Sequence, residues 1–206
     1  MITKTQARKK SSRISSENVK SGLHIYVAYW RANIHRFAMD YLNVNLHVFQ
    51  IILLYMMDKN TFFMFIASRG LGKSFLISIY CCCRAILYPE SKIIVGAGSR
   101  GQAKLLISQK IEKELMSMSP MLRKEIKEIR CGANEARVIF WNGSTIEAVV
   151  SGDGSRGYRA NILICDEFRL IDKDVLDKVM RPMLAATRTP KFMFKEEYKD
   201  HPKEQN

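Results

Sequence analysis

The segment that decides the fold is Ala67-Ser-Arg-Gly-Leu-Gly-Lys-Ser74. It follows an apolar, aromatic-rich run, Thr61 to Ala67, which is typical of a buried parallel strand. It leads into Lys73 to Leu87, a segment that predicts a helix ending before Pro89. A glycine-containing turn between a strand and a helix is the context of a Walker A phosphate-binding loop, because backbone N–H groups and the positive end of the helix dipole then face the phosphates.

The residue types in this loop suit that chemistry. Gly70 and Gly72 allow the tight turn that points successive N–H groups into one concavity. Lys73 would place a positive charge against the β- and γ-phosphates of a nucleotide, and the Ser74 hydroxyl would ligate Mg²⁺. Ala67 stands where the general pattern has glycine, so we expect a first turn of different shape.

Arg69 lies inside the same loop and has two interpretations. It could be a solvated loop cation, or its guanidinium could reach the γ-phosphate of the nucleotide. We favour the second, which makes Arg69 a catalytic as well as a nucleotide-binding candidate. The nucleotide-binding candidates of the loop are Ser68, Arg69, Gly70, Gly72, Lys73 and Ser74.

A second motif follows the apolar run Ile162-Leu-Ile-Cys165, where two carboxylates, Asp166 and Glu167, come in succession. This is a Walker B pattern. A buried strand that ends in Asp166 delivers one carboxylate to the Mg²⁺ shell, where the metal offsets the cost of burying the charge. Glu167 points elsewhere and can accept the proton of an attacking water. The two motifs together predict an ATP hydrolase that uses ATP and Mg²⁺.

Two further regions supply weaker candidates. The glycine-rich loop from Ser151 to Arg159 carries Arg156 and Arg159, either of which could stabilise charge on a transferring phosphoryl group, in trans if subunits form a ring. Alternatively, both arginines bind DNA phosphates or face solvent. Gln50 could pair with adenine and Phe49 could stack on it, but either could equally pack between helices.

The rest of the chain alternates strands and helices. Lys92 to Ala97 predicts a buried strand, Gly101 to Met118 an amphipathic helix, and Lys173 to about Ala186 a further helix. Arg137 to Trp141 and Ser144 to Val150 are β-rich runs joined by Asn142-Gly143, a strong hairpin signal. The predicted fold class is α/β: a P-loop NTPase of the additional-strand type, with a mainly parallel central sheet flanked by helices and an antiparallel hairpin.

Composition limits the possible classes of protein. The chain has 206 residues, a net charge of +13 and a pI near 9.6, which favours polyanionic partners such as nucleic acid. No apolar stretch reaches the roughly 20 residues that span a bilayer, so we expect a cytoplasmic protein without a membrane partner. Five cysteines without paired spacing predict reduced thiols. Candidate DNA contacts are the basic arm with Lys9, Lys10 and Arg13, and the region from Arg100 to Lys127; a solvated surface explains them equally well.

The predicted domain organisation has four parts. Residues 1–22 have the composition of a basic disordered arm, and 23–58 form a helical N-terminal segment that includes helices from Ile25 to about Leu42 and from Leu46 to Met57. Residues 59–188 form the ATPase core. Residues 189–206, which include two prolines, are expected to connect to a C-terminal part outside this sequence.

The motifs in combination resemble the large subunit of tailed-phage terminases over about residues 45–195. The resemblance rests on the Arg-bearing phosphate loop, the run Lys92-Ile-Ile-Val-Gly-Ala-Gly98 with Gln102-Ala103, the Gly-Ser-Arg-Gly-Tyr-Arg-Ala-Asn segment and Ile-Leu-Ile-Cys-Asp-Glu. It implies a ring-forming motor that hydrolyses ATP to move double-stranded DNA through a portal protein into a procapsid, with a small terminase subunit as a further partner.

The resemblance also implies roles for individual residues. Lys73, Ser74 and Arg69 would hold nucleotide and metal, Asp166 would bind Mg²⁺, and Glu167 would be the catalytic carboxylate. Arg156 would match the trans-acting arginine and Gln50 the adenine-reading position. The nuclease domain that usually follows has no counterpart here, so no nuclease activity is expected. Two alternatives stay open: a helicase-like DNA translocase, or a truncated fragment that binds nucleotide and DNA without turnover.

Overall fold

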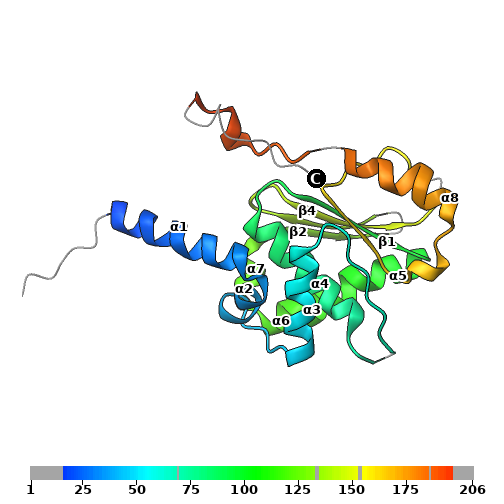
Figure 1. Ribbon diagram of the computed structural model, residues 1–206, viewed down its shortest axis with the longest axis horizontal. Coiled ribbons are helices and arrows are strands. Elements are labelled where there is room, and N and C mark those ends of the chain that lie inside the picture. The colour runs from blue at the N-terminus through cyan, green and yellow to red at the C-terminus, as the bar shows by residue number, and fades with distance from the viewer. Residues whose placement is uncertain (1–15, 69, 133–134, 153–154, 186, 197–206) are drawn as a thin grey trace, which may run out of the picture.

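A five-stranded sheet forms the centre of the computed structural model, which describes residues 16–68, 70–132, 135–152, 155–185 and 187–196. The strand order is β2-β3-β4-β1-β5 (Figure 1). The strands are β1 (Lys92–Ala97), β2 (Ile126–Cys131), β3 (Ala136–Phe140), β4 (Thr145–Val150) and β5 (Ile162–Cys165). The predicted strands at Lys92–Ala97 and Ile162–Cys165 are thus confirmed, as is the hairpin around Asn142-Gly143.

The sheet is mixed, which corrects the expectation of a mainly parallel one. β1 pairs in parallel with β4 and with β5, whereas β3 pairs antiparallel with both β2 and β4. The difference arises because β2 was not predicted and because Thr61–Ala67, predicted as a parallel strand, is not in the sheet. The sequence of β2 is polar, with Lys127, Glu128 and Arg130 exposed, and a register shift between Ile126 and Glu128 breaks its alternation. Such charge is common on strands at a sheet edge.

The run Thr61–Ala67 is not a strand, which corrects a second expectation. It lies outside the sheet, and Phe62 and Ile66 are 86% and 93% exposed. The sheet ends at β5, which pairs only with β1 among the described residues. High β-propensity is not sufficient for a strand, because a strand also needs a neighbour with which to form its backbone hydrogen bonds.

Helices lie on both faces of the sheet (Figure 1). Their bounds are α1 (Ser16–Ala32), α2 (Ile34–Asp40), α3 (Val48–Lys59), α4 (Lys73–Leu87), α5 (Arg100–Leu105), η1 (Leu106–Leu115), α6 (Met116–Met118), α7 (Pro120–Glu125), η3 (Phe168–Leu170), α8 (Lys173–Val175), η4 (Leu176–Met180), η5 (Arg181–Ala185) and η6 (Lys191–Phe194). Helix α1 begins at Ser16, within the segment predicted as a disordered arm.

Each predicted helix has a counterpart. The segment expected from Ile25 to Leu42 is divided between α1 and α2, and α5, η1 and α6 follow one another over the range predicted as one helix. The short helix α7 was not predicted. Over the described residues, no helix is long and apolar enough to cross a membrane.

Two hydrophobic clusters hold the layers together. The larger one joins α2, α4 and η1 to one face of the sheet and includes Phe37, Leu76, Ile107 and Phe140. The smaller one joins Ile94 and Val149 of the sheet to Met180 and Met183 of η4 and η5 on the other face. Helix α4 is enclosed most completely, since all eight residues from Leu76 to Cys83 are buried. The sheet and α4 therefore form a rigid frame for the loops at the carboxyl ends of β1, β4 and β5.

Candidate nucleotide-binding and catalytic site

The phosphate loop ends at the N-terminus of α4, where Gly72 is the N-cap residue. Gly70 and Gly72 have φ angles of +87° and +72°, in the left-handed region that glycine adopts without a steric penalty. No side chain caps this end of α4. The first N–H groups of the helix therefore have no side-chain cap, which is compatible with the predicted phosphate loop. Arg69 lies outside the described residues.

Lys73 crosses back over the loop. Its Nζ donates to the backbone oxygen of Ala67 at 2.7 Å and to that of Ser68 at 2.9 Å. The ammonium group thus lies against the turn that would surround the phosphates. A nucleotide phosphate would compete with these two carbonyl oxygens for the same charge.

The two motifs meet at Ser74 and Asp166. The Ser74 Oγ donates to Asp166 Oδ2 at 3.2 Å, although 92 residues separate the two positions in the chain. Asp166 Oδ1 accepts from the backbone N–H of Glu167 at 3.0 Å, and the Asp166 N–H donates to the Gly96 oxygen at 2.9 Å. The backbone of β1 therefore helps to fix the carboxylate position at the end of β5.

Glu167 follows in the left-handed region, with φ +50°, which is uncommon for a residue with a side chain. Its Oε2 accepts from Gln102 Nε2 at 2.8 Å. Gln102 lies in α5, directly after β1, and the Ser99 side chain caps its N–H. The Gln102 Oε1 is buried and has no hydrogen-bond partner.

Gln102 was not assigned a role in the site from the sequence. The available signal is positional: Gln102 begins a helix after the carboxyl end of β1, and Glu167 follows the carboxyl end of β5, the parallel neighbour of β1. Loops after neighbouring parallel strands meet at the same edge of a sheet. That signal indicates proximity, but the hydrogen bond itself depends on the rotamers of both side chains.

Gln50 and Phe49 lie beside the loop at the start of α3. Gln50 is buried, and its Oε1 accepts from the His47 N–H at 2.9 Å, so its amide oxygen completes the helix cap. Its Nε2 faces Gly72, at 3.6 Å from the position a Cβ would take there. Phe49 lines an apolar groove of about 380 Å³ next to the loop, together with Ile52, Phe65, Leu71 and Lys73.

Arg156 and Arg159 are exposed on the loop between β4 and β5. The loop leaves β4 with the Ser151 N–H donating to the Ala97 oxygen at 3.0 Å. It contains a turn in which both the N–H and the Oγ of Ser155 donate to the Gly152 oxygen, and Gly157 has φ +95°. The loop therefore begins at the same carboxyl edge of the sheet as the acidic pair.

Comparison with known proteins identifies the family. The family model described as terminase large subunit, T4likevirus-type, N-terminal, matches residues 64–196. The chain belongs to the terminase large-subunit family. This confirms the resemblance found in the sequence. No curated protein sequence matches.

Solved structures of terminases share the fold. The large terminase ATPase domain of Thermus phage P74-26 superposes with a TM-score of 0.53 at 18% identity, over 71% of this chain and 63% of that one. The HK97 bacteriophage large terminase gives 0.56 at 20% identity, over 70% of this chain and 32% of that one. The chain therefore spans less than two thirds of either terminase chain.

Proposed function

We propose that this terminase chain is an ATPase domain that hydrolyses ATP to drive double-stranded DNA into a procapsid. The observation that carries the proposal is the approach of Ser74 Oγ to Asp166 Oδ2 at 3.2 Å. It brings the hydroxyl that follows the phosphate loop and the carboxylate of the acidic strand to one point. A generic Gly-Lys-Ser turn has no reason to meet an acidic strand end in this way.

These two oxygens suit a magnesium ion. Two ligands bound side by side to Mg²⁺ at about 2.0–2.1 Å lie about 2.9 Å apart, close to the separation seen here. Among the described residues no group of three or more His, Cys, Asp or Glu could hold a metal. The other ligands of the ion would be phosphate oxygens and water. When bound, Mg²⁺ would offset charge on the phosphate oxygens.

The protein groups around that point have distinct tasks. The N-terminus of α4 and Lys73 would bind the β- and γ-phosphates, with Lys73 exchanging the Ala67 and Ser68 oxygens for phosphate. Glu167 would orient the attacking water and accept its proton, and the hydrogen bond from Gln102 fixes where that carboxylate points. The apolar groove beside Phe49 would receive the base, with Gln50 next to it.

Two arginines complete the proposed chemistry. Arg69 would reach the γ-phosphate from within the loop, and Arg156 would act on the nucleotide of a neighbouring subunit in a ring. The exposure of Arg156 on a glycine-rich loop supports a role toward a partner rather than in the core. Terminase membership further supports a portal protein and a small terminase subunit as partners in the host cytoplasm.

A fragment that binds nucleotide without turnover is the second candidate. It is favoured by one observation: the segment before the phosphate loop is not held in the sheet, and Ile66 is 93% exposed. A loop anchored on one side only would bind phosphate but would hold the γ-phosphate less firmly toward Glu167. Catalysis is sensitive to displacements of about 1 Å, so this difference decides between binding and turnover.

Steady-state ATP hydrolysis over a series of protein concentrations, with and without duplex DNA, tests the proposal. Lys73→Ala removes phosphate binding, and Glu167→Gln retains binding but removes the base. We expect activity in the unmodified chain that rises with protein concentration or DNA and is lost in both variants. Nucleotide binding by the unmodified chain and by Glu167→Gln, with no turnover in either, would establish the second candidate instead.

A further inference from the structure

Helix α7 and the start of β2 form a surface with an excess of basic residues. Arg123, Lys124 and Lys127 are exposed, and none of them forms an ion pair with another described residue. The two acidic residues in the same stretch have other hydrogen-bond donors, and among the described residues only Glu128 of the two is paired with a cation, Arg130. Glu125 accepts from the Tyr41 hydroxyl at 2.5 Å, and Glu128 accepts from its neighbour Arg130 at 2.7 and 3.1 Å.

Several basic residues on other helices form ion pairs with acidic residues of the same helical stretch, although within the described part of the chain Lys104, Lys113 and Lys173 do not. Each of three pairs one helical turn apart holds an ion pair: Arg36–Asp40 at 2.9 Å, Lys178–Asp174 at 2.8 Å and Arg181–Asp177 at 2.9 Å. Paired side chains contribute little net field to the surroundings. Over residues 123–130 four basic side chains stand against two acidic ones, so this stretch keeps an excess of positive charge.

An exposed tryptophan adjoins these cations. Trp141, at the β3–β4 turn, is 67% exposed, and Lys127 Nζ lies 5.6 Å from the centroid of its ring. The backbone N–H of Trp141 donates to the backbone oxygen of Glu125 at 3.1 Å, which fixes the turn against the end of α7. The exposed Trp141 ring could pack against a ligand, and its indole N–H could donate to an anion.

We propose that Arg123, Lys124, Lys127 and Trp141, here called the α7 patch, bind the phosphate backbone of duplex DNA. The proposal rests on the proposed function, since it names the surface by which the motor holds its DNA. Three cations and one aromatic ring fit a duplex backbone better than a single strand, whose binding sites stack successive bases on several aromatic rings.

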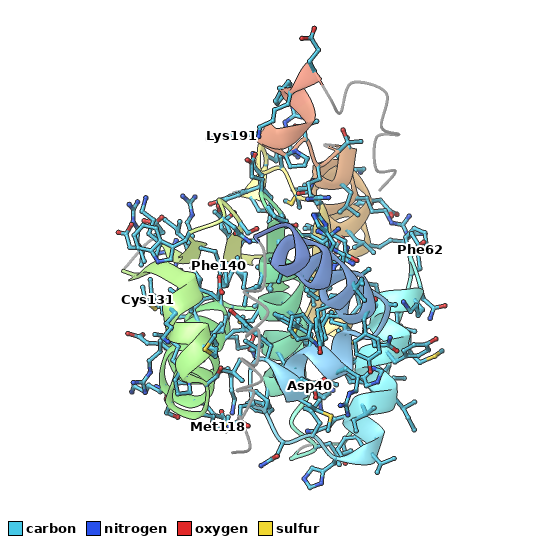
Figure 2. All side chains as sticks on the ribbon, turned by 90° about the vertical axis from the view of Figure 1, so that its left-hand side faces the viewer. Asp40, Phe62, Met118, Cys131, Phe140 and Lys191 are labelled. Carbon is cyan, nitrogen blue, oxygen red and sulfur yellow. The ribbon has the colours of Figure 1, made fainter. Side chains whose placement is uncertain are left out.

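The patch is remote from the nucleotide site. Figure 2 places Cys131, at the end of β2, and Phe62, in the segment that leads to the phosphate loop, on opposite sides of the molecule. β2 and β5 are likewise the two outer strands of the sheet. DNA on the α7 patch would therefore leave the phosphate loop open to nucleotide.

A charge-reversal pair tests the patch. Lys124→Glu with Lys127→Glu is compared with Lys173→Glu and Lys195→Glu, two exposed lysines elsewhere, so that both double variants carry the same net charge. Binding of a fluorescent 30-base-pair duplex is followed by anisotropy over a range of salt concentrations, without nucleotide. We expect affinity to fall at least about tenfold more in the patch variant, with a salt slope lower by about 1.8.

Equal losses in the two double variants would overturn the proposal, because they would show a general effect of net charge. A loss confined to a 30-nucleotide single strand would overturn it as well. ATP hydrolysis without DNA separates this proposal from the proposed function, since the patch variant should retain the basal rate. If neither the unmodified chain nor either double variant hydrolyses ATP, but only the patch variant loses affinity for duplex DNA, the hydrolysis proposal fails and the α7 patch proposal is supported.

Tryptophan fluorescence gives an independent readout. The chain has two tryptophans, so Trp30→Phe leaves Trp141 as the reporter. We expect duplex DNA to quench this emission at low salt, and added salt to restore it. If anisotropy detects DNA binding but the Trp141 emission does not change, Trp141 is not part of the patch. If, in addition, the Lys124→Glu, Lys127→Glu variant binds DNA with unchanged affinity, the proposed surface is refuted.

Discussion

The two ends of α4 differ in how their backbone groups are satisfied. At the N-terminal end, Gly72 provides no side-chain cap, and the first N–H groups face an open loop. At the C-terminal end, the carbonyl oxygens have partners. Asn142 Nδ2 donates to those of Ala85 and Ile86, and Arg31 donates twice to that of Leu87.

The residues just beyond the helix continue this pattern. The Tyr88 oxygen accepts from two serine hydroxyls, and the Pro89 oxygen accepts from Arg188 at 2.8 Å. The Tyr88 ring has three guanidinium groups within 4.0–5.5 Å, those of Arg31, Arg84 and Arg188. One helix thus has a C-terminal end whose carbonyl oxygens are bonded to the rest of the fold and an N-terminal end without a side-chain cap, here called the open end. Substitutions at the open end should change activity, and those at the bonded end should change stability.

The largest expected effect follows from Ser74→Ala at the open end. The variant loses the hydroxyl that meets Asp166, so Mg²⁺-dependent ATP hydrolysis should fall on the order of 100-fold. Stability should change by less than about 1 kcal/mol, because a single part-buried hydrogen bond is lost. Hydrolysis rates over a Mg²⁺ titration and urea unfolding measure the two quantities. A large loss of stability with normal hydrolysis would contradict the proposal that the N-terminal end of α4 serves activity rather than stability.

Asn142→Ala should have the opposite profile. It removes the donor for the Ala85 and Ile86 oxygens and the acceptor for the Ser144 N–H, so we expect the free energy of unfolding to fall by about 1–3 kcal/mol. Hydrolysis per folded molecule should stay within about twofold of the unmodified chain. Urea unfolding followed by circular dichroism checks the first value. A fall in the rate of ATP hydrolysis without a change in the free energy of unfolding would contradict the assigned difference between the two ends of α4.

The smallest expected effect concerns His35 on α2, whose ring lies 5.9 Å from that of Tyr55. Burial, and secondarily Arg36, lowers the pKa of His35 below its ordinary value of 6.5. Between the lowered pKa and 6.5 the unfolded chain binds more protons than the folded chain, so the free energy of unfolding should decrease as the pH falls through this window. His35→Gln should flatten the dependence between pH 7.5 and 5.5, whereas His24→Gln, at an exposed position on α1, should not.

Much of the frame could be predicted because it depends on local pattern. Continuous apolar runs predicted β1 and β5, and the Asn142-Gly143 turn predicted the hairpin. The glycines at 70 and 72 predicted the start of α4. The Ser74–Asp166 contact followed from the expected adjacency of two motifs. These features require only the residues that form them, or a rule about neighbouring parallel strands.

The features that could not be predicted depend on partners distant in sequence. Thr61–Ala67 has the composition of a strand, but strand formation also depends on a neighbour, which composition does not report. β2 carries charges because it is an edge strand, so its sequence lacks the apolar alternation of a strand. Gln102 belongs to the site because it donates a hydrogen bond to Glu167. The position of Glu167 depends on its left-handed backbone conformation, which a sequence pattern does not reveal.

The three consecutive cysteines in α4 have a mechanical consequence. Successive residues of a helix point about 100° apart, so three fully buried neighbours, Cys81, Cys82 and Cys83, mean that the helix is enclosed on all sides at this level. Such a helix cannot rotate about its axis without opening the core. A conformational change at the phosphate loop would therefore move α4, about 22 Å long, as one rigid body. It would tilt the helix or shift it along its axis rather than rotate it about that axis.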